Sequence, residues 1–343
     1  MTDHERWRLR GPVRSCRLER TWNSRGSGAE PRGDATSLEF RSDGNLAARL
    51  QHNPDGSEWT STYEYDDSGR LIQMRTESAA GIAVSFCDYD DAGRLLRVLA
   101  RDEAGDRIVE TYEYDSSGST HKTIHVDAAG HGSGTQRAWG VEGTDSAYSA
   151  PNTATLTTTY NDRDQPTRLL FRDAAGRELS QVQFRYDDAG RLVEEVQMNS
   201  EAVLPPEMLA GANAAQLQTL RGFLGVGEGS IRRTHAYDEQ GRRVETRSNT
   251  GPVGFDKQTL TLNDFGDPIV QVYEHEERDY GIDEEGRFSE RPTREHASRT
   301  EARFQYEYDS HGNWISKKVE NRSGSEGEFS ISAAERRTIT YFV

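Results

Sequence analysis

The side chains that could do chemistry in this chain of 343 residues are two cysteines, nine histidines and a series of regularly spaced aspartates. Cys87 and His235 are the residue types that a nucleophile and its general base require. Each stands two residues before a tyrosine of a predicted strand, where related segments have Tyr, Phe, Leu or Thr. Because that position faces the core, we interpret Cys87 and His235 as structural residues.

Aspartates recur at equivalent positions of a short motif, as in Asp66, Asp90 and Asp187. Two carboxylates can share the roles of acid and base when they flank one substrate at a fixed separation. Each of these aspartates belongs to its own turn, so nothing in the pattern makes them converge on a substrate. We therefore expect them to be structural.

Two groups of side chains offer metal ligands without a recognised spacing. His121 and His125 fall on one face of a predicted strand and are most simply surface residues. The charged segment 274–299 carries oxygen ligands that would suit calcium but match no EF-hand loop: His275, Glu276, Glu277, Asp279, Asp283 and Glu284. Motifs for phosphate loops, zinc sites and serine hydrolases are missing as well. We predict no metal site, no cofactor and no enzymatic activity.

The aspartates belong to a repeat of about 25 residues. It is clearest in YEYDDSGRL from Tyr63, DYDDAGRL from Asp88 and FRYDDAGRL from Phe184. The residue before the Asp, or its equivalent, anchors nine copies: Phe40, Tyr65, Tyr89, Tyr114, Tyr160, Tyr186, Tyr237, Leu262 and Tyr308. Four residues past the anchor, eight of the nine copies have glycine and one has Asp.

The glycine column predicts a tight turn in each copy. A type I turn followed by a left-handed residue closes a β-hairpin, and glycine adopts the positive φ of that residue without strain. The Asp after the anchor can accept hydrogen bonds from backbone N–H groups of the same turn. The predicted turn residues are Asp66, Gly69, Asp90, Gly93, Asp115, Gly118, Asp187, Gly190, Asp238, Gly241, Asp309 and Gly312.

A second glycine follows about 12 residues after the first in most copies, so each copy predicts two strands and two turns. Further strands are expected at 15–22 and 336–343. We predict an all-β fold, a long antiparallel meander of about twenty strands curled into a shell-like or open barrel-like sheet, with one helical insertion. The alternative is a β-propeller, because two copies would make one four-stranded blade.

The domain organisation follows from the same repeat. Residues 1–37 would form a lead-in strand and loop, and residues 38–343 would form the repeat domain. Three gaps between copies carry extra chain, at about 129–152, 199–230 and 274–299. In a regular meander all three insertions would lie at the end of the sheet opposite the anchor turns, and repeat proteins often bind partners on such a side.

The three insertions differ in composition. The composition of the first insertion predicts a flexible loop or, alternatively, a loop whose aromatic side chains contact a partner. The second predicts a helix that starts at Pro205 and Pro206 and ends at the glycines after residue 221, acting as a cap or as a docking helix. The third predicts a solvated or disordered charged loop. The candidate binding-loop residues are Trp139, Tyr148, Leu217, Leu220 and Phe223.

Composition limits the partners. The formal net charge of −16 disfavours nucleic-acid binding, because an acidic chain repels phosphate backbones. No run of 18 apolar residues predicts a membrane span, and no apolar segment near the start predicts a cleaved signal peptide. We expect a cytoplasmic protein, or one exported without a cleaved signal. The oligomeric state stays open.

The motif Y-x-Y-D-x-x-G-R-L at about 25 residues resembles the YD-repeat, or rearrangement hot-spot, family over roughly residues 38–318. The resemblance implies a long meander that curls into a shell, which in large members encloses a toxic domain. It also implies display outside the cell and carbohydrate contact in other members. The leading prediction is a non-enzymatic binding or scaffolding protein for a protein or carbohydrate partner. The alternatives are a shell fragment or accessory of a polymorphic toxin system and, more weakly, a carbohydrate-active enzyme.

Overall fold

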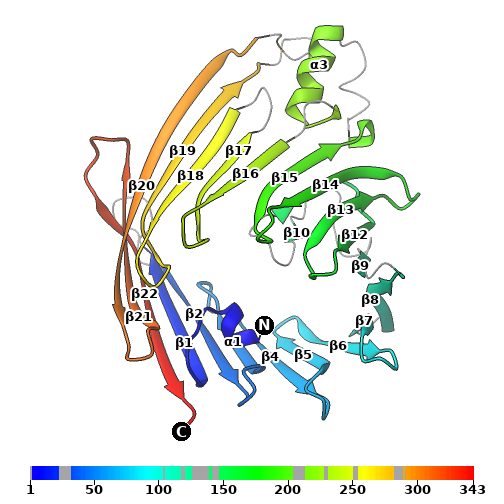
Figure 1. Cartoon of the computed structure of the whole chain (residues 1–343), viewed down its shortest axis with the longest axis vertical. Coiled ribbons are helices and arrows are strands. Elements are labelled where there is room, and N and C mark those ends of the chain that lie inside the picture. The colour runs from blue at the N-terminus through cyan, green and yellow to red at the C-terminus, as the bar shows by residue number, and fades with distance from the viewer. Residues whose placement is uncertain are drawn as a thin grey trace. The chain divides into compact units, whose positions relative to one another are not determined.

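The computed structural model describes residues 2–22, 32–102, 105–116, 120–125, 139–140, 147–203, 213–227, 231–249, 254–281, 289 and 291–343. The side chains of residues 102, 139, 140, 147, 215, 219 and 223 lie outside this description. The chain groups into two compact units (Figure 1). Unit 1 comprises Met1–Ile108, Thr261–Gln271 and Thr300–Val343, and unit 2 comprises Val109–Leu260 and Val272–Arg299.

The prediction of an all-β antiparallel chain is confirmed. Twenty described strands are paired in long sheets within the two units, and two short strands, β10 (Trp139–Gly140) and β11 (Ala147–Tyr148), form a separate pair. The described helices are α1 (Asp3–Arg6), the 3-10 helix η1 (Glu201–Val203) and α3 (Ala214–Phe223). Among the described residues, no helix is long and apolar enough to cross a membrane.

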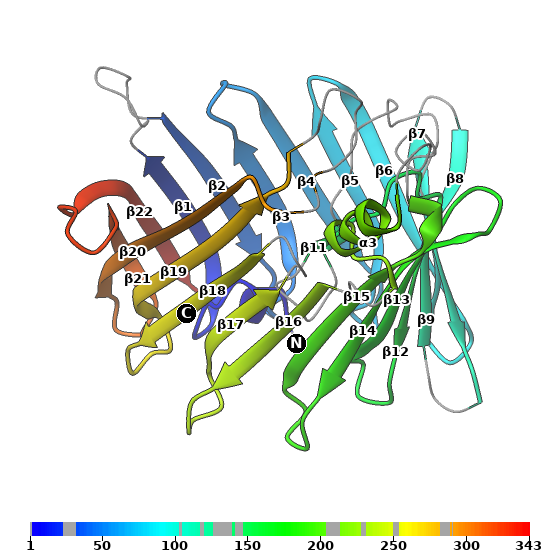
Figure 2. The same ribbon diagram turned by 90° about the horizontal axis from the view of Figure 1, so that it is seen from above.

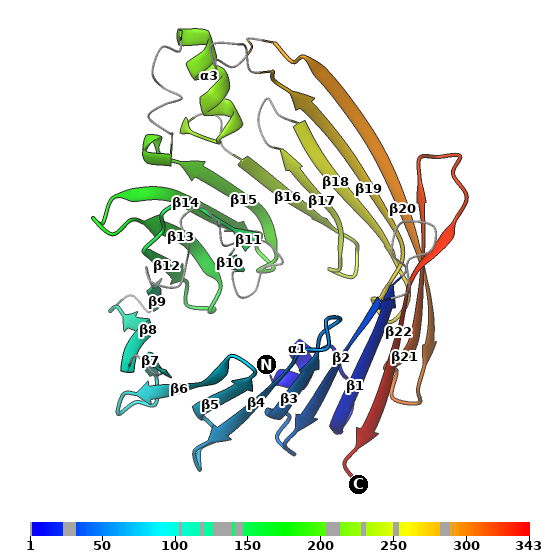
Figure 3. The same cartoon turned by 180° about the vertical axis from the view of Figure 1, so that it is seen from behind.

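Unit 1 is a meander in which each strand pairs antiparallel with the next. In sheet order its strands are β20 (Arg294–Tyr308), β21 (Trp314–Ser323), β22 (Ser330–Tyr341), β1 (Val13–Trp22), β2 (Arg32–Phe40), β3 (Leu46–His52), β4 (Glu58–Tyr65), β5 (Leu71–Ser78), β6 (Gly81–Tyr89) and β7 (Leu95–Asp102). Strand β1 lies between β2 and β22, so the first and last strands of the chain are sheet neighbours (Figures 1, 2 and 3). Both terminal strands, predicted at 15–22 and 336–343, are present with slightly different bounds.

Unit 2 continues the same construction. Its strands are β8 (Gly105–Tyr114), β9 (Thr120–His125), β12 (Thr155–Tyr160), β13 (Pro166–Arg172), β14 (Glu178–Tyr186), β15 (Leu192–Asn199), β16 (Ile231–Tyr237), β17 (Arg243–Asn249), β18 (Gly254–Leu262) and β19 (Pro268–Asp279), some of which share residues with unit 1. From β8 to β18 each strand pairs antiparallel with the next in this order. The propeller alternative is wrong, because in both units the strand pairing runs on well beyond the four strands of a blade.

The two faces of each strand differ, as the alternating pattern predicts. In β14, Val182 and Phe184 are buried and the intervening Gln183 and Arg185 are exposed. Unit 2 has a core that includes Leu156, Leu169, Phe171, Val182 and Phe184. Unit 1 has its own core, which includes Leu9, Val13, Cys16, Leu38, Phe40 and Leu46.

The second and third insertions depart from expectation at their ends. Helix α3 begins at Ala214, and the predicted start at Pro205 and Pro206 lies outside the described residues. The third insertion is partly strand, because β19 continues to Asp279 and β20 already begins at Arg294. Its charges pair instead of only facing water: Glu274 lies 3.0 Å from Arg299, and Arg278 lies 3.5 Å from Glu295. Alternating opposite charges therefore extend the strands where a loop was predicted.

Candidate functional site

The anchor turns have the geometry that the glycine column predicts. Gly190 has φ +79° and donates its N–H to the Asp187 carbonyl at 2.9 Å. One carboxylate oxygen of Asp187 accepts the backbone N–H of Arg191 at 2.8 Å, and the other accepts Nε of the same arginine at 2.7 Å. Both oxygens of the conspicuous aspartate are thus bound within its own turn.

The same arrangement recurs along both units. Positive φ is found at Gly69, Gly93, Gly190, Gly241 and Gly312. Asp66, Asp90 and Asp238 each bind the arginine four residues on, through its backbone N–H and its Nε. Asp309 accepts the N–H of Asn313 instead, and Asp115 is described without its turn partner Gly118, which lies outside the described residues.

The turn hydrogen bonds hold the aspartates in their charged form. Bonds from the side chain and backbone of Arg191 lower the pKa of Asp187, and bonds from the backbone and side chain of Arg70 lower that of Asp66. A general acid needs a carboxyl whose pKa is raised towards neutrality. The direction of these shifts is therefore the opposite of what acid catalysis requires.

Sequence reasoning missed the role of the arginine that follows the turn glycine. Arg191 not only binds Asp187 but also stacks on the ring of Tyr237 in the next copy, with Cζ 5.0 Å from the ring centre. The hydroxyl of Tyr237 in turn donates to the Leu192 carbonyl at 2.7 Å. Arg70 stacks on Tyr89 in the same way. The visible signal was the recurrent Gly-Arg pair, which at Arg70 and Arg191 links one copy to the next.

The second insertion is a fixed element at the end of β15. Its helix α3 is capped by Asn213, whose side chain accepts the N–H of Gln216. The chain after the helix is held by Asn199, whose backbone N–H donates to Gly225 O at 2.9 Å and whose Nδ2 donates to Leu224 O at 2.6 Å. Figure 2 shows α3 beside the end of β15.

The structure gives the predicted binding-loop residues of α3 different degrees of exposure. Leu220 is only 2% exposed and packs with Val226, Val203 and Leu224 in a small cluster, of which Val203 also contacts the core of unit 2. Leu217 is half-buried, and the side chain of Phe223 lies outside the described residues. The side of α3 that solvent reaches carries Asn213, Ala214, Gln218 and Arg221.

The first insertion places Tyr148 in the core. Strand β11 pairs with β10 through Trp139 and Tyr148, and the Trp139 side chain lies outside the described residues. The Tyr148 ring is 6% exposed and packs edge-to-face on Phe184 with ring centres 6.0 Å apart. Tyr148 is therefore a core aromatic of unit 2, and an incoming partner cannot stack on it.

His235 faces the core of unit 2, as its position two residues before Tyr237 predicts. It has polar partners there. Its side chain is 1% exposed, with Nε2 2.7 Å from Glu195 Oε1 and Nδ1 3.0 Å from Thr246 Oγ1. Glu195 is 2% exposed and also lies 3.5 Å from Arg233. The sequence did not indicate Glu195, because a glutamate on a strand is usually exposed. This buried row satisfies the imidazole and fixes the register of β15, β16 and β17.

The other titratable residues singled out in the sequence are not gathered into a metal site. His121 lies 3.2 Å from Thr159, and His125 lies 3.3 Å from Thr111. Hydrogen bonding to Asp256 at 2.7 Å raises the pKa of His275. Asp283 and Glu284 lie outside the described residues, and no group of three or more potential metal ligands occurs in the described ranges.

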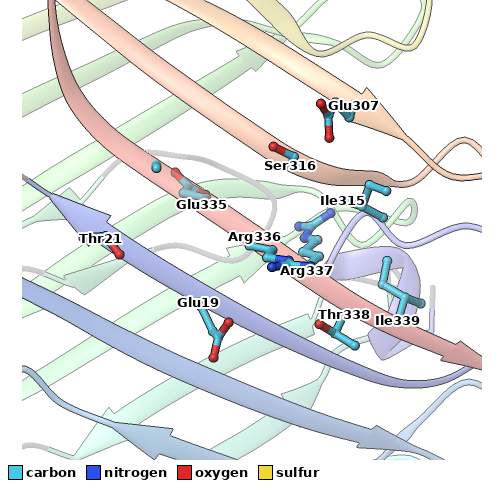
Figure 4. A pocket seen from close by; sticks show the side chains of 11 residues that line it. Glu19, Thr21, Glu307, Ile315, Ser316, Glu335, Arg336, Arg337, Thr338 and Ile339 are labelled. Carbon is cyan, nitrogen blue, oxygen red and sulfur yellow. The ribbon is translucent and has the colours of Figure 1, made fainter.

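A surface hollow of about 740 Å³ crosses four strands of unit 1. Figure 4 shows Glu307, Ser316, Arg336 and Glu19 along it. The strand register puts these four side chains in one row across β20, β21, β22 and β1. Three strand spacings separate the backbones of Glu307 and Glu19 by about 14 Å, with Arg336 between them.

Comparisons with known proteins add little. No protein-family model matches the chain, and no curated protein matches it. Among solved structures, a porin-like protein from Bacteroides uniformis ATCC 8492 aligns with 96% of this chain and 99% of its own, at 13% identity and a TM-score of 0.36. Two structures of TcdB2-TccC3, one with Cdc42 and one without the hypervariable C-terminal region, align with 91% of this chain and 18% of theirs, at 12% identity and TM-scores of 0.25 and 0.24. Scores this low carry no argument about function.

Proposed function

We propose that this chain is a non-enzymatic scaffold of YD-type repeats that holds an insertion of unit 2 in place for a protein partner. The observation that carries the proposal is the attachment of α3. Asn199 at the end of β15 binds two carbonyls of the chain that follows the helix, and Leu220 anchors the helix in a small cluster that meets the main core only through the partly buried Val203. A helix that completes neither the sheet nor its core, yet is held rigidly, suits recognition better than stability.

The repeat itself supports a scaffolding role. The aspartates of the anchor turns are bound by their own arginines, and the anchor tyrosines donate to carbonyls of neighbouring hairpins. The hydrogen-bonding capacity of these polar groups is therefore used within the repeat itself. Partner specificity would then come from the non-repeated chain, where α3 presents Gln218 and Arg221 to solvent.

The test is site-specific photo-crosslinking in cells of the source organism. A photoreactive amino acid replaces Gln218 on α3 or, as the matched control, the equally exposed Gln183 on β14. We expect one protein to be crosslinked from position 218 and not from position 183, and its identification by mass spectrometry names the partner. If that partner is a toxin, the toxin-accessory alternative takes the place of a general scaffold.

A deletion of residues 204–229, bridged by a short Gly-Ser linker, provides the second arm. We expect the sheet of unit 2 to keep its melting temperature, because the main core contains no residue of α3. The crosslinked complex, now probed from Ser200 at the insertion base, should disappear. Equal crosslinking from positions 218 and 183, or a complex that survives the deletion, would refute the proposal.

A further inference from the structure

Two arginines of unit 1 are stacked on tryptophan rings. Arg49 of β3 lies between Trp59 and Trp7, with Cζ 4.6 Å from the first ring centre and 5.5 Å from the second. Arg337 of β22 lies on Trp314, with Cζ 3.7 Å from the ring centre. Stacking on a ring fixes the plane of a guanidinium group but leaves its N–H edge free for an acceptor.

Neither guanidinium has an acceptor among the described residues. No hydrogen bond or ion pair joins Arg49 or Arg337 to them, and Arg49 Nε and Arg337 Nη1 are fully buried without a hydrogen-bond partner. Other ring-stacked arginines of unit 1 are paired, as Arg70 is with Asp66 at 2.7 Å and Arg322 with Glu301 at 2.5 Å. Stacking without pairing therefore sets these two apart.

The carboxylates near Arg337 are bound to other side chains. Glu335 binds Lys317 at 2.9 Å, and Asp267 accepts the hydroxyl of Tyr308 at 2.8 Å. Burial lowers the pKa of Arg337, which reports the cost of taking its charge out of water. Glu335 and Asp267 lie near enough to raise that pKa, but neither contacts the guanidinium, so a ligand that bonds to it directly would gain a charge-assisted hydrogen bond.

The strand register places both arginines on one face. Arg337 is opposite Leu18, which is opposite Thr36, and Thr36 is opposite Gln51. Arg49 precedes Gln51 by two residues on β3 and so shares its face. Leu38, which is 1% exposed, lies opposite Arg49, so apolar side chains form the floor between the two cations.

We propose that this face of β22, β1, β2 and β3 binds oxyanion groups at two separate contacts, Arg49 and Arg337, which lie three strand spacings, about 14 Å, apart and therefore each take their own carboxylate or phosphate group. Carboxylate and phosphate groups match the fork of a guanidinium in two parallel hydrogen bonds. The chain carries a net charge of −16, so an anion must be held by such local contacts and not by the overall field. The site lies in unit 1 and does not depend on the role of α3.

The test uses inorganic phosphate and citrate as probes, with sodium chloride at equal ionic strength as the reference. Binding is followed by isothermal titration calorimetry and by tryptophan fluorescence, since the rings of Trp7, Trp59 and Trp314 contact the arginines. We expect saturable binding of one or both probes with a Kd of about 1 mM or tighter. Citrate alone would identify the ligand as a carboxylate, and phosphate alone would identify it as a phosphate.

The variants Arg49→Gln and Arg337→Gln should each weaken binding at their own contact at least about tenfold, the loss expected for one charge-assisted hydrogen bond, and leave the other contact intact. Arg336→Gln is the matched control, because it removes the same charge from the next residue of β22 on the opposite face. If a glutamine variant does not fold, Arg49→Lys and Arg337→Lys keep the charge without the fork and should still lose most of the binding. No saturable binding to the wild type, or equal loss in the Arg336 control, would overturn the proposal.

Discussion

The anchor turns and the insertion at the end of β15 are built from the same chain on different principles. In the turns, a few residue types recur and each polar atom is bound locally, as the two oxygens of Asp187 are by Arg191. At the insertion nothing recurs, and one helix is held by two hydrogen bonds from Asn199 and by the packing of Leu220. The difference teaches that repetition here marks architecture, and that residues with one-off contacts are where function should be sought.

The strongest contrast between the two regions should appear when one leucine is shortened in each. Leu169 is fully buried in the core of unit 2, so Leu169→Ala should cost about 2–5 kcal/mol of global stability. Leu220→Ala creates a similar cavity under α3 but should leave the melting of the sheet unchanged and speed proteolysis near α3. Calorimetry and limited proteolysis measure the two effects. An equal fall in global melting would show that α3 belongs to the main core.

The turn geometry can be broken at a single glycine. Gly190→Val forces a β-branched residue to φ +79° and places its Cβ 3.3 Å from Gln165 Nε2, so it should cost about 1–3 kcal/mol. The reverse change has a natural site, since Asp164 already occupies the equivalent position at φ +55°. Asp164→Gly should alter stability by less than about 1 kcal/mol. Chemical denaturation measures both, and an unchanged Gly190→Val variant would refute the turn assignment.

A fall in pH should next destabilise the anchor turns more than the insertion. The pKa of Asp187 is lowered by its bonds to Arg191, so this carboxylate stabilises the fold above the pKa of about 3.9 it has in an unfolded chain. That contribution is lost as the pH falls through the lower folded-state pKa. Melting temperatures measured from about pH 6 to pH 2 should fall less steeply in Asp187→Asn than in the wild type. Parallel curves would mean that the turn bonds contribute nothing.

The smallest effect should come from two tyrosine hydroxyls. Tyr186 Oη donates to the Pro166 carbonyl at 2.8 Å, so Tyr186→Phe should cost about 0.5–1.5 kcal/mol. Tyr148 Oη is buried without a hydrogen-bond partner in the described part of the chain. Tyr148→Phe should therefore be neutral or slightly stabilising, as urea denaturation can show. A larger loss at Tyr148 than at Tyr186 would reverse the contrast.

Much of the fold could be predicted because local chemistry determines it. A residue at positive φ demands glycine, and alternate residues of a strand face one core, so Gly190 and the pair Val182 and Phe184 were readable from sequence alone. The candidate sites could not be predicted in the same way. Whether Tyr148 is buried depends on which strand its loop meets, and the stacking of Arg49 depends on Trp7, which is 42 residues away in sequence. Such contacts do not recur at a regular spacing, so the sequence carries no periodic signal for them.

The position of β1 between β2 and β22 sets the order of assembly of unit 1. Ser15 and Thr340 are hydrogen-bonded at a sequence separation of 325 residues. Closing a flexible loop of that length costs about 5 kcal/mol of conformational free energy. Only the further residue pairs between β1 and β22 offset this cost. On the ribosome β1 can pair with β2 early, but its other edge stays open until β22 emerges, nearly the whole chain later. Folding of unit 1 should therefore be slow and end with the docking of β22, and a nascent chain halted before β22 should expose an unpaired strand edge to chaperones or to other copies.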